Sequence, residues 1–375
     1  MDAGAELRHL GCSEPRPLVE YKPVPRRMNR AASGRVALTR IEDDPVAWDA
    51  IVADHPEAEV FHGAPWLDYL AATQGAEPVV AVVTDAGRAV GYFVGAIVRR
   101  FGLRILGSPL RGWATMYMGF LLEQGFDRRA AAVALAHFAF DDLGCFHVEL
   151  ADRWMNPDQM VGSGFNVERG HTFVVDLSST EGEILSRMPR GTRYDVRRAG
   201  TRGLHAERAM EGSFADEYYA DLITVFARQG LAPTYAVERV RQLIRSLGPT
   251  DGVLLMRVRA ASGDSVATAI VVGRNETAVL WGAAFDRANA YLRPNELLHW
   301  EAMRYWRAKG ILRYDMGGGG DYKAQYGGVE TPTYWFNRSR YRVFGLGRTA
   351  VRRLVRARQI VHGRLARRAG PSASP

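Results

Sequence analysis

The order of secondary-structure patterns, repeated in the two halves of the chain, is the strongest constraint on the fold. In the first half, strand-like segments lie at 78–84, 89–100 and 146–152, with an amphipathic helical segment at 126–144. In the second half, strand-like segments lie at 253–260, 265–273, 277–285 and 311–317, with a helical segment at 295–310. Strand, strand, helix, glycine and strand in this order twice predict a duplicated α/β unit, with mixed sheets flanked by helices.

Chain length and glycine positions suggest the domain boundaries. A chain of 375 residues favours two domains over one. Helical segments at 181–200, 216–230 and 235–248 each end at a glycine, and no sustained heptad predicts a coiled-coil arm. We therefore expect a disordered leader at 1–35, domains at 36–176 and 177–343, and a separate tail at 344–375.

The excess positive charge lies near the C-terminus. The chain carries a formal charge of +8, and residues 338–375 contain eleven arginines with no lysine and no acidic residue, which leaves 38 basic and 41 acidic residues in 1–337. Apolar residues recur between these arginines at roughly helical spacing, at Val351, Leu354, Val355, Val361 and Leu365. The tail is expected to be a basic amphipathic helix that contacts anionic lipid or a nucleic-acid backbone, or a solvated tail.

Cysteine use and hydropathy indicate the compartment. Cys12 and Cys145 are the only cysteines, and no run of eighteen apolar residues occurs. Residues 1–35 lack the apolar core of a signal peptide. These features predict a cytoplasmic protein.

Candidate site residues cluster around the last predicted helix. Pro294 and Asn295 predict a helix start with Asn295 as the N-cap, and the free N–H groups of such a start can bind an anion. Asp315 ends a strand that runs into four glycines, which let the backbone approach a ligand closely. Lys323 follows in a chain that otherwise prefers arginine, and its compact ammonium suits an oxyanion or a phosphate. The plainer interpretations are an ordinary helix start, a mobile loop and a surface lysine.

A second cluster is rich in arginine. Seven arginines lie within 22 residues, between 187 and 208, against only Asp195 and Glu207. On a helix, Arg190, Arg193 and Arg197 share one face, where their guanidinium groups could clamp a pyrophosphate. The alternative is an exposed helix with surface ion pairs.

Several other chemistries lack their motifs. The chain has no P-loop, no Gly-x-Ser-x-Gly elbow and no His-Glu-x-x-His. The glycine loop has Tyr322 where a dinucleotide fingerprint needs its third glycine, and His147-Val-Glu149 has the alternation of a strand rather than the pattern of a metal pair. We expect no metal and no cofactor.

Several motifs together suggest a family. In the second half these are LWGAAF (280–285), LRPNELLHWEAMRYWRAKG (292–310), YDMGG (314–318) and a lysine shortly before YGG (326–328). HTFVVDLSST (171–180) precedes the arginine-rich segment, and the first half contributes VFHGAPWLDYL (60–70), GYFVGAIVRR (91–100) and ILGSPLRGWATMYMG (105–119). Over about residues 36–343 the chain resembles the Fem-type peptidoglycan-bridge aminoacyltransferases and their relatives among tandem N-acetyltransferase (GNAT)-fold proteins.

The resemblance implies two fused GNAT-like domains with the active site in the second. In the family the donor is an aminoacyl-tRNA, and the acceptor is an amine of a UDP-linked or lipid-linked muropeptide. By position, Lys323 would contact the donor and stabilise the oxyanion, Arg193 and Arg197 would bind acceptor phosphates, and Trp281 would line the cleft. The other candidate residues are Asn295, Gly317, Gly318 and Tyr322 for substrate, and Arg352, Arg353 and Arg356 of the tail for contact with tRNA or an anionic membrane. Asp315 is a candidate proton acceptor beside Asp321, or a structural residue at the strand end.

The donor class is inferred from a missing turn. Acyl-CoA enzymes of this fold hold the pyrophosphate at a glycine-rich turn before the central helix. Here residues 285–295 read FDRANAYLRPN, and the corresponding turn of the first half lacks the motif too. We therefore predict transfer from an aminoacyl-tRNA to an amine of a peptidoglycan precursor or related acceptor, with the protein peripheral at the inner membrane face through its tail. The alternatives are an acyl-CoA-dependent N-acyltransferase in polysaccharide or natural-product biosynthesis, and a non-catalytic RNA- or membrane-binding module.

Overall fold

The structure is a computed structural model that describes residues 35–41, 44–209, 212–228, 230–285 and 287–341. The predicted C-terminal helix, with Arg352, Arg353 and Arg356, and the predicted leader up to residue 34 lie outside the described residues. Among the helices of the described part, none is long and apolar enough to cross a membrane.

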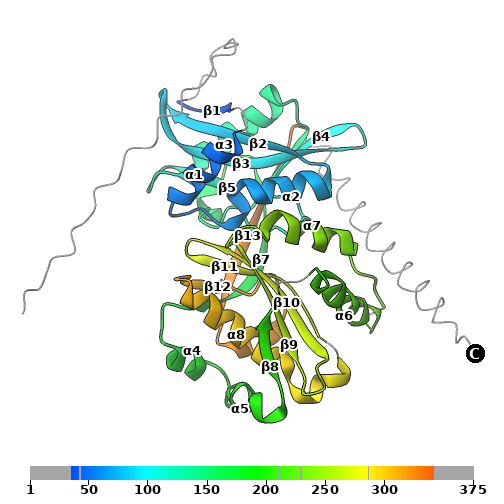
Figure 1. The fold of residues 1–375 in the computed structure, drawn as a ribbon. Helices are drawn as coiled ribbons and strands as arrows, with labels where there is room; N and C mark the ends of the chain where they lie inside the picture. The colour runs from blue at the N-terminus through cyan, green and yellow to red at the C-terminus, as the bar shows by residue number, and fades with distance from the viewer. Residues whose placement is uncertain (1–34, 42–43, 210–211, 229, 286, 342–375) are drawn as a thin grey trace, which may run out of the picture. The chain divides into compact units, whose positions relative to one another are not determined.

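The elements follow the predicted order and add strands that the sequence patterns did not indicate (Figure 1). Short 3₁₀ or π helices are labelled η. The elements up to residue 176 are β1 (Val36–Arg40), α1 (Pro45–Asp54), η1 (Val60–His62), α2 (Ala64–Gln74), β2 (Glu77–Asp85), β3 (Arg88–Arg100), β4 (Leu103–Ser108), β5 (Gly119–Leu122), α3 (Arg128–His137), η2 (Phe138–Asp142), β6 (His147–Leu150), η3 (Pro157–Met160) and β7 (Asn166–Asp176). Those that follow are α4 (Glu181–Arg187), α5 (Arg190–Arg198), η4 (Gly200–Arg202), β8 (His205–Arg208), α6 (Phe214–Arg228), α7 (Val237–Leu247), β9 (Val253–Arg259), β10 (Ser265–Arg274), β11 (Thr277–Phe285), η5 (Arg287–Leu292), α8 (Pro294–Ala308), β12 (Arg313–Asp315), η6 (Asp321–Tyr326) and β13 (Val329–Ser339).

The strands of the described residues form one mixed sheet that joins the two halves. Its order is β1-β2-β3-β4-β6-β13-β7-β12-β11-β10-β9-β8, with β5 paired to β3. Each half places its last strand beside a strand of the other half, because β7 pairs antiparallel with β12 and β13 pairs antiparallel with β6. The two exchanged strands also pair with each other, from Val329 opposite Val174 to Asn337 opposite Asn166. The sheet is therefore continuous from one half to the other.

Each half contains the same strand–helix–strand unit. Helix α3 precedes β6, which pairs in parallel with β4, and helix α8 precedes β12, which pairs in parallel with β11. Parallel neighbours need a crossover connection, which a helix supplies. The duplicated α/β plan predicted from the sequence is thus present, and both halves contribute strands to one mixed sheet.

The arginine-rich segment differs from its prediction as one helical stretch. It forms two short helices, α4 and α5, separated at Met188 and Pro189. Met188 takes an extended ψ of 146°, as expected for a residue before proline, because the proline ring disfavours helical geometry there. The strand β8 then follows where the sequence analysis proposed no strand.

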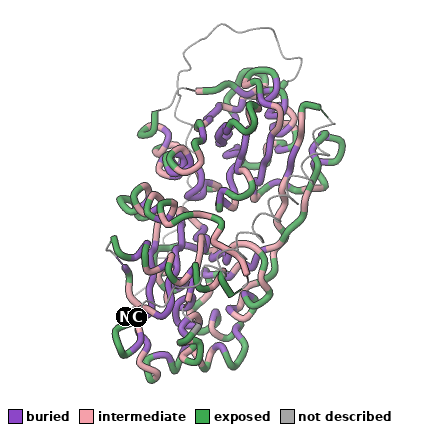
Figure 2. The backbone as a smooth tube through the Cα atoms, turned by 90° about the vertical axis from the view of Figure 1, so that its right-hand side faces the viewer, coloured by how far each residue is buried: buried purple, intermediate pink, exposed green. Residues whose placement is uncertain are grey.

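Burial concentrates in the central strands and the helices that cover them (Figure 2). Strand β3 is buried from Val90 to Val98, which explains its continuous apolar run. One core cluster contains residues of both halves, including Trp66 and Leu121 from the first and Tyr218 from the second. The two halves therefore share a hydrophobic core.

Candidate active site

A pocket lies where two parallel strands separate. Strands β11 and β12 pair only from Thr277 opposite Arg313 to Val279 opposite Asp315. Beyond these residues β11 continues along β10, while the chain after β12 enters the glycine loop. The pocket has an empty volume of about 580 Å³, part of it open to solvent. It is lined by Phe61, Ala114, Met116, Val279, Leu280, Trp281, Gly282, Ala283, Met316, Gly317, Tyr322 and Lys323.

A β-bulge presents Trp281 to this pocket. The register between β10 and β11 shifts, with Ile270 opposite Gly282 and Val271 opposite Leu280, so Trp281 is the extra residue. Its ring packs 5.3 Å from the Tyr235 ring, and its indole Nε1 is buried without a hydrogen-bond partner among the described residues. The wall thus offers an aromatic surface and one unused donor.

Gly282 leaves no room for a side chain beside the bulge. A Cβ there would lie 2.2 Å from the Tyr218 hydroxyl oxygen, and Tyr218 is itself buried. That hydroxyl lies 2.9 Å from the Tyr235 hydroxyl. The close approach of α6 to the bulge therefore requires glycine at this position.

Lys323 lines the pocket and forms hydrogen bonds with the backbone of the glycine loop. It lies in η6, is buried, and its Nζ donates to the carbonyl oxygens of Met316 (2.8 Å), Gly317 and Gly318 (3.2 Å). Gly317 has a φ of +64°, and a Cβ there would lie 2.7 Å from the Leu280 carbonyl oxygen, so the loop needs glycine to fold this closely. Burial lowers the pKa of Lys323 from its usual 10.5, and the Asp315 carboxylate partly opposes that shift.

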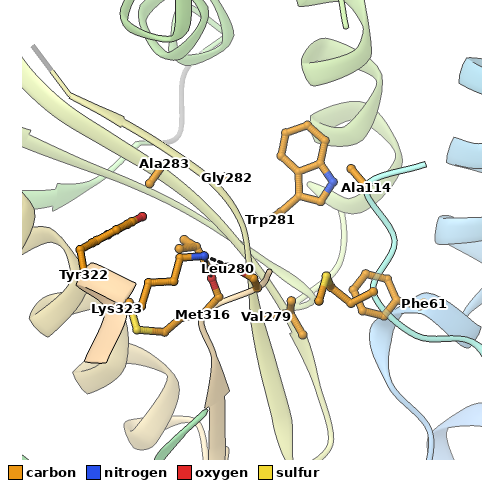
Figure 3. A pocket seen from close by; sticks show the side chains of 12 residues that line it. Phe61, Ala114, Val279, Leu280, Trp281, Gly282, Ala283, Met316, Tyr322 and Lys323 are labelled. Atoms are coloured by element: carbon orange, nitrogen blue, oxygen red, sulfur yellow. Dashed lines mark hydrogen bonds between the residues drawn. The ribbon is translucent and has the colours of Figure 1, made fainter. Parts of the chain in front are cut away.

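Figure 3 shows how the walls face each other. Lys323 and Tyr322 lie on one side of the pocket, Phe61 and Ala114 lie on the opposite side, and Trp281 lies between them. The structure therefore brings together Lys323, Trp281, Gly317 and Tyr322 of the sequence-based candidates, with the Gly318 carbonyl bound to Lys323.

Asp315 is engaged in a buried network at the end of β12. Its carboxylate accepts hydrogen bonds from Arg153 Nη1 and Nη2 (both 3.1 Å), Thr172 Oγ1 (2.6 Å) and the Gly317 N–H (3.0 Å). The side chain is fully buried. This geometry favours the structural alternative for Asp315, and its role as proton acceptor stays a prediction.

Asn295 does not have its predicted place at the helix start. Helix α8 begins one residue earlier, at Pro294, and Arg293 occupies the N-cap position with a φ of +61°. The physical reason is that proline suits the first helical position, where its missing N–H would have had no partner within the helix. Asn295 lies in the first turn, and its Oδ1 is buried without a hydrogen-bond partner in the described part of the chain.

Arg193 and Arg197 lie on α5 and do not line the pocket. Helix α5 packs against α8. Arg193 Nη1 donates to the Ser186 carbonyl oxygen at 3.0 Å, whereas Arg197 is exposed. A role for these arginines toward acceptor phosphates stays a prediction.

Sequence reasoning missed the first-half wall of the pocket. Phe61 and Met116 lie in the quoted segments 60–70 and 105–119, but no residue of either segment was singled out. Their approach to β11 depends on packing between the halves, which local patterns do not reveal. No group of three or more His, Cys, Asp or Glu side chains suited to a metal occurs among the described residues.

His299 predicts a pH-dependent stability. It packs 4.5 Å from the Tyr326 ring, and burial, followed by the nearby Lys323 charge, lowers its pKa from 6.5 to about 3. Between pH 6.5 and 3 the unfolded chain binds more protons, so the free energy of unfolding should fall with decreasing pH, by at most about 1.4 kcal/mol per pH unit from this residue. Urea unfolding at pH 7 and pH 5 should show a smaller difference for His299→Phe than for wild type. Equal differences would contradict this assignment; His62, whose pKa is also lowered to about 3, contributes to both proteins.

Comparisons with known proteins identify one matching domain and several similar folds. Residues 186–326 match the family of acetyltransferase (GNAT) domains. No curated protein matches the sequence. A crystal structure of FemX is similar with a TM-score of 0.66 and 15% identity, covering 80% of this chain and 97% of that one.

Two further solved structures share the fold. A tandem GNAT protein from the clavulanic acid biosynthesis pathway has a TM-score of 0.50 and 11% identity, covering 81% of this chain and 98% of its own. A conserved protein of unknown function from Bacteroides thetaiotaomicron VPI-5482 has a TM-score of 0.53 and 13% identity, covering 79% of this chain and 97% of its own. These likenesses confirm the predicted α/β fold class with tandem GNAT architecture. The matched acetyltransferase domain supports an acyltransferase of the GNAT fold.

Proposed function

We propose that this chain is an aminoacyltransferase that moves an aminoacyl group from a charged tRNA to an amine of a cell-envelope precursor or a related acceptor. The observation that carries the donor choice is the start of α8, where a GNAT enzyme would hold the pyrophosphate of coenzyme A. Pro294 has no N–H, and the Arg293 N–H donates to the Ala290 carbonyl oxygen at 3.1 Å. The buried Glu296 carboxyl group lies in the same first turn, 2.8 Å from Arg293 Nη2. An acid and a proline therefore occupy the place that suits a phosphate in other helices.

The lining of the pocket supports an acyl group with an uncharged side chain. Lys323 is the one charged side chain among the described residues that line it, and its ammonium is already bound to the loop. Phe61, Met116, Met316 and Trp281 present apolar surface. A cationic side chain would be desolvated here beside an ammonium, so the acyl group we propose carries an uncharged side chain.

The reaction needs alignment and one stabilised negative charge. The acceptor nitrogen attacks the ester carbonyl carbon, a C–N bond forms, the C–O ester bond breaks, and the tRNA hydroxyl leaves with a proton that the amine has released. Alignment of this kind supplies up to roughly 7–11 kcal/mol in favourable systems. Lys323 Nζ would exchange one loop carbonyl for the developing oxyanion, a contribution of about 3 kcal/mol.

An acyl-CoA-dependent N-acyltransferase is the second candidate. The observation that favours it is the family description of residues 186–326 as an acetyltransferase domain. The acceptor would again be an amine at the same pocket. A CoA donor would have to place its pyrophosphate away from the first turn of α8, because Pro294 and Glu296 occupy that turn.

Transfer from labelled aminoacyl-tRNA tests the proposal. The protein is incubated with mixed charged tRNA and an envelope-precursor extract, with and without RNase pretreatment, and parallel reactions contain acyl-CoA donors. We expect RNase-sensitive label in an amide-linked product. Turnover with an acyl-CoA and none with any charged tRNA would instead establish the second candidate.

A further inference from the structure

Arg153, which follows β6, lies between two buried carboxylates and an aromatic ring. Its side chain is 12% exposed, while those of its partners Glu59 and Asp315 are 5% and 0% exposed. Nε and Nη2 donate to the Glu59 carboxylate, Nη1 and Nη2 donate to Asp315 Oδ2, and the guanidinium carbon lies 3.9 Å from the centre of the Tyr117 ring. The planar fork of arginine makes these contacts at the same time, which a lysine ammonium cannot do.

The partners of Arg153 lie beside both walls of the pocket. Glu59 precedes η1, which carries Phe61. Tyr117 directly follows Met116, which lines the pocket. These two segments form the first-half wall.

The third partner belongs to the second-half wall. Asp315 directly precedes the lining residues Met316 and Gly317, and its carboxylate also accepts the Gly317 N–H at 3.0 Å. That N–H belongs to the same loop whose carbonyl oxygens bind Lys323. One guanidinium group therefore connects two segments of the first-half wall with the segment of the second-half wall that lies across the pocket.

The charges explain why the connection is stable. Burial opposes the charge of Arg153, but Glu59 and Asp315 outweigh that effect and raise its pKa. Two carboxylates of opposite walls that share one cation are held at a fixed separation, because moving either wall would leave a buried charge unpaired.

We propose that Arg153 is a positioning residue that sets the separation of the Phe61–Met116 wall from the Met316–Gly317 wall, and thereby the fit of the acyl group. Its kinetic consequence rests on the proposed transfer function, whereas its structural consequence does not. Substrate contact is made by the walls and not by Arg153 itself.

The test compares the wild type with Arg153→Lys. Methyl-labelled methionine reports the walls directly, and Met116→Leu and Met316→Leu identify the two signals. In Arg153→Lys we expect both methyl resonances to shift or broaden while the protein remains folded. Transfer activity should fall roughly 10- to 100-fold in kcat/KM, with donor KM changed more than acceptor KM, because small displacements of a reacting group have effects of this size.

Arg257→Lys is the matched control. The Arg257 side chain is 4% exposed and also pairs with two carboxylates, Glu207 and Glu217, neither of which lines the pocket. This variant should lose thermal stability, as the Arg153 variant does. The Met116 and Met316 methyl resonances and the donor KM should be unchanged.

The outcomes separate this inference from the proposed function. Unchanged Met116 and Met316 signals in a folded Arg153→Lys would overturn the positioning role, as would the same signal shifts in Arg257→Lys. If the wild type transfers no acyl group from any donor, the proposed function fails, and the methyl signals still decide the inference. If Arg153→Lys does not fold, Glu59→Gln, which keeps the side-chain shape and removes one charge of the bridge, takes its place with the same two expected shifts.

Discussion

Replacing Lys323 by methionine is expected to lower kcat for acyl transfer by roughly 10²- to 10³-fold. The Nζ group lies at the pocket wall and is held by loop carbonyl oxygens of Met316, Gly317 and Gly318, close to where an acyl carbonyl would enter between β11 and β12. Methionine keeps an unbranched side chain, one heavy atom shorter than that of lysine, and removes the ammonium. The loss should therefore fall on the transition state, where the oxyanion develops, rather than on donor binding.

Single-turnover kinetics and donor affinity separate these two effects. We expect the rate constant of the chemical step to fall while the donor dissociation constant changes less than about tenfold. Lys309→Met is the control, because Lys309 is half-exposed, pairs with Asp251 at 3.3 Å and does not line the pocket. A Lys323→Met enzyme with an unchanged chemical rate would assign Lys323 to the loop structure alone.

The same lysine shows what local sequence rules can and cannot predict. The sequence singled out the glycine loop and Lys323 from local motifs and Trp281 through the family resemblance, and Gly317, Lys323 and Trp281 all line the pocket. The N-cap lies two residues before the predicted one, at Arg293 instead of Asn295, because asparagine as N-cap and proline at the first helical position are competing local rules, and proline prevailed. Lys323 as a donor to three backbone carbonyls could not be derived, since it depends on how the loop closes.

Contacts between distant segments lay beyond the sequence patterns. Periodicity indicates a strand but not its neighbour, so the pairing of β13 with β6 and of β7 with β12 had no sequence signal. Arg153 gave no signal either, because its two carboxylate partners lie 94 and 162 residues away. The sequence could therefore predict only one wall of the pocket. The second-half wall is formed by a local motif. The first-half wall reaches the pocket because the exchanged strands and the shared core bring the two halves together.

Asp315→Asn is expected to lower the free energy of unfolding by about 3–5 kcal/mol, the usual effect of removing one partner from a buried ion pair. The variant would leave Arg153 with Glu59 as its remaining carboxylate. Its amide could not replace the carboxylate, because Thr172, Arg153 and the Gly317 N–H all donate to Asp315 and an NH₂ group would face a donor.

Urea unfolding at pH 7 measures this change, and Asp321→Asn is the matched control. Asp321 lies six residues on, at the start of η6, and is exposed, so its substitution should change the free energy of unfolding by no more than about 0.5 kcal/mol. The pair of variants also separates the two roles assigned to Asp315. If Asp315 is a proton acceptor, Asp315→Asn should lose transfer activity while the protein stays as stable as wild type. If Asp315 mainly forms the buried ion pair with Arg153, the variant should lose stability first, and with it the alignment of the glycine loop that carries Lys323.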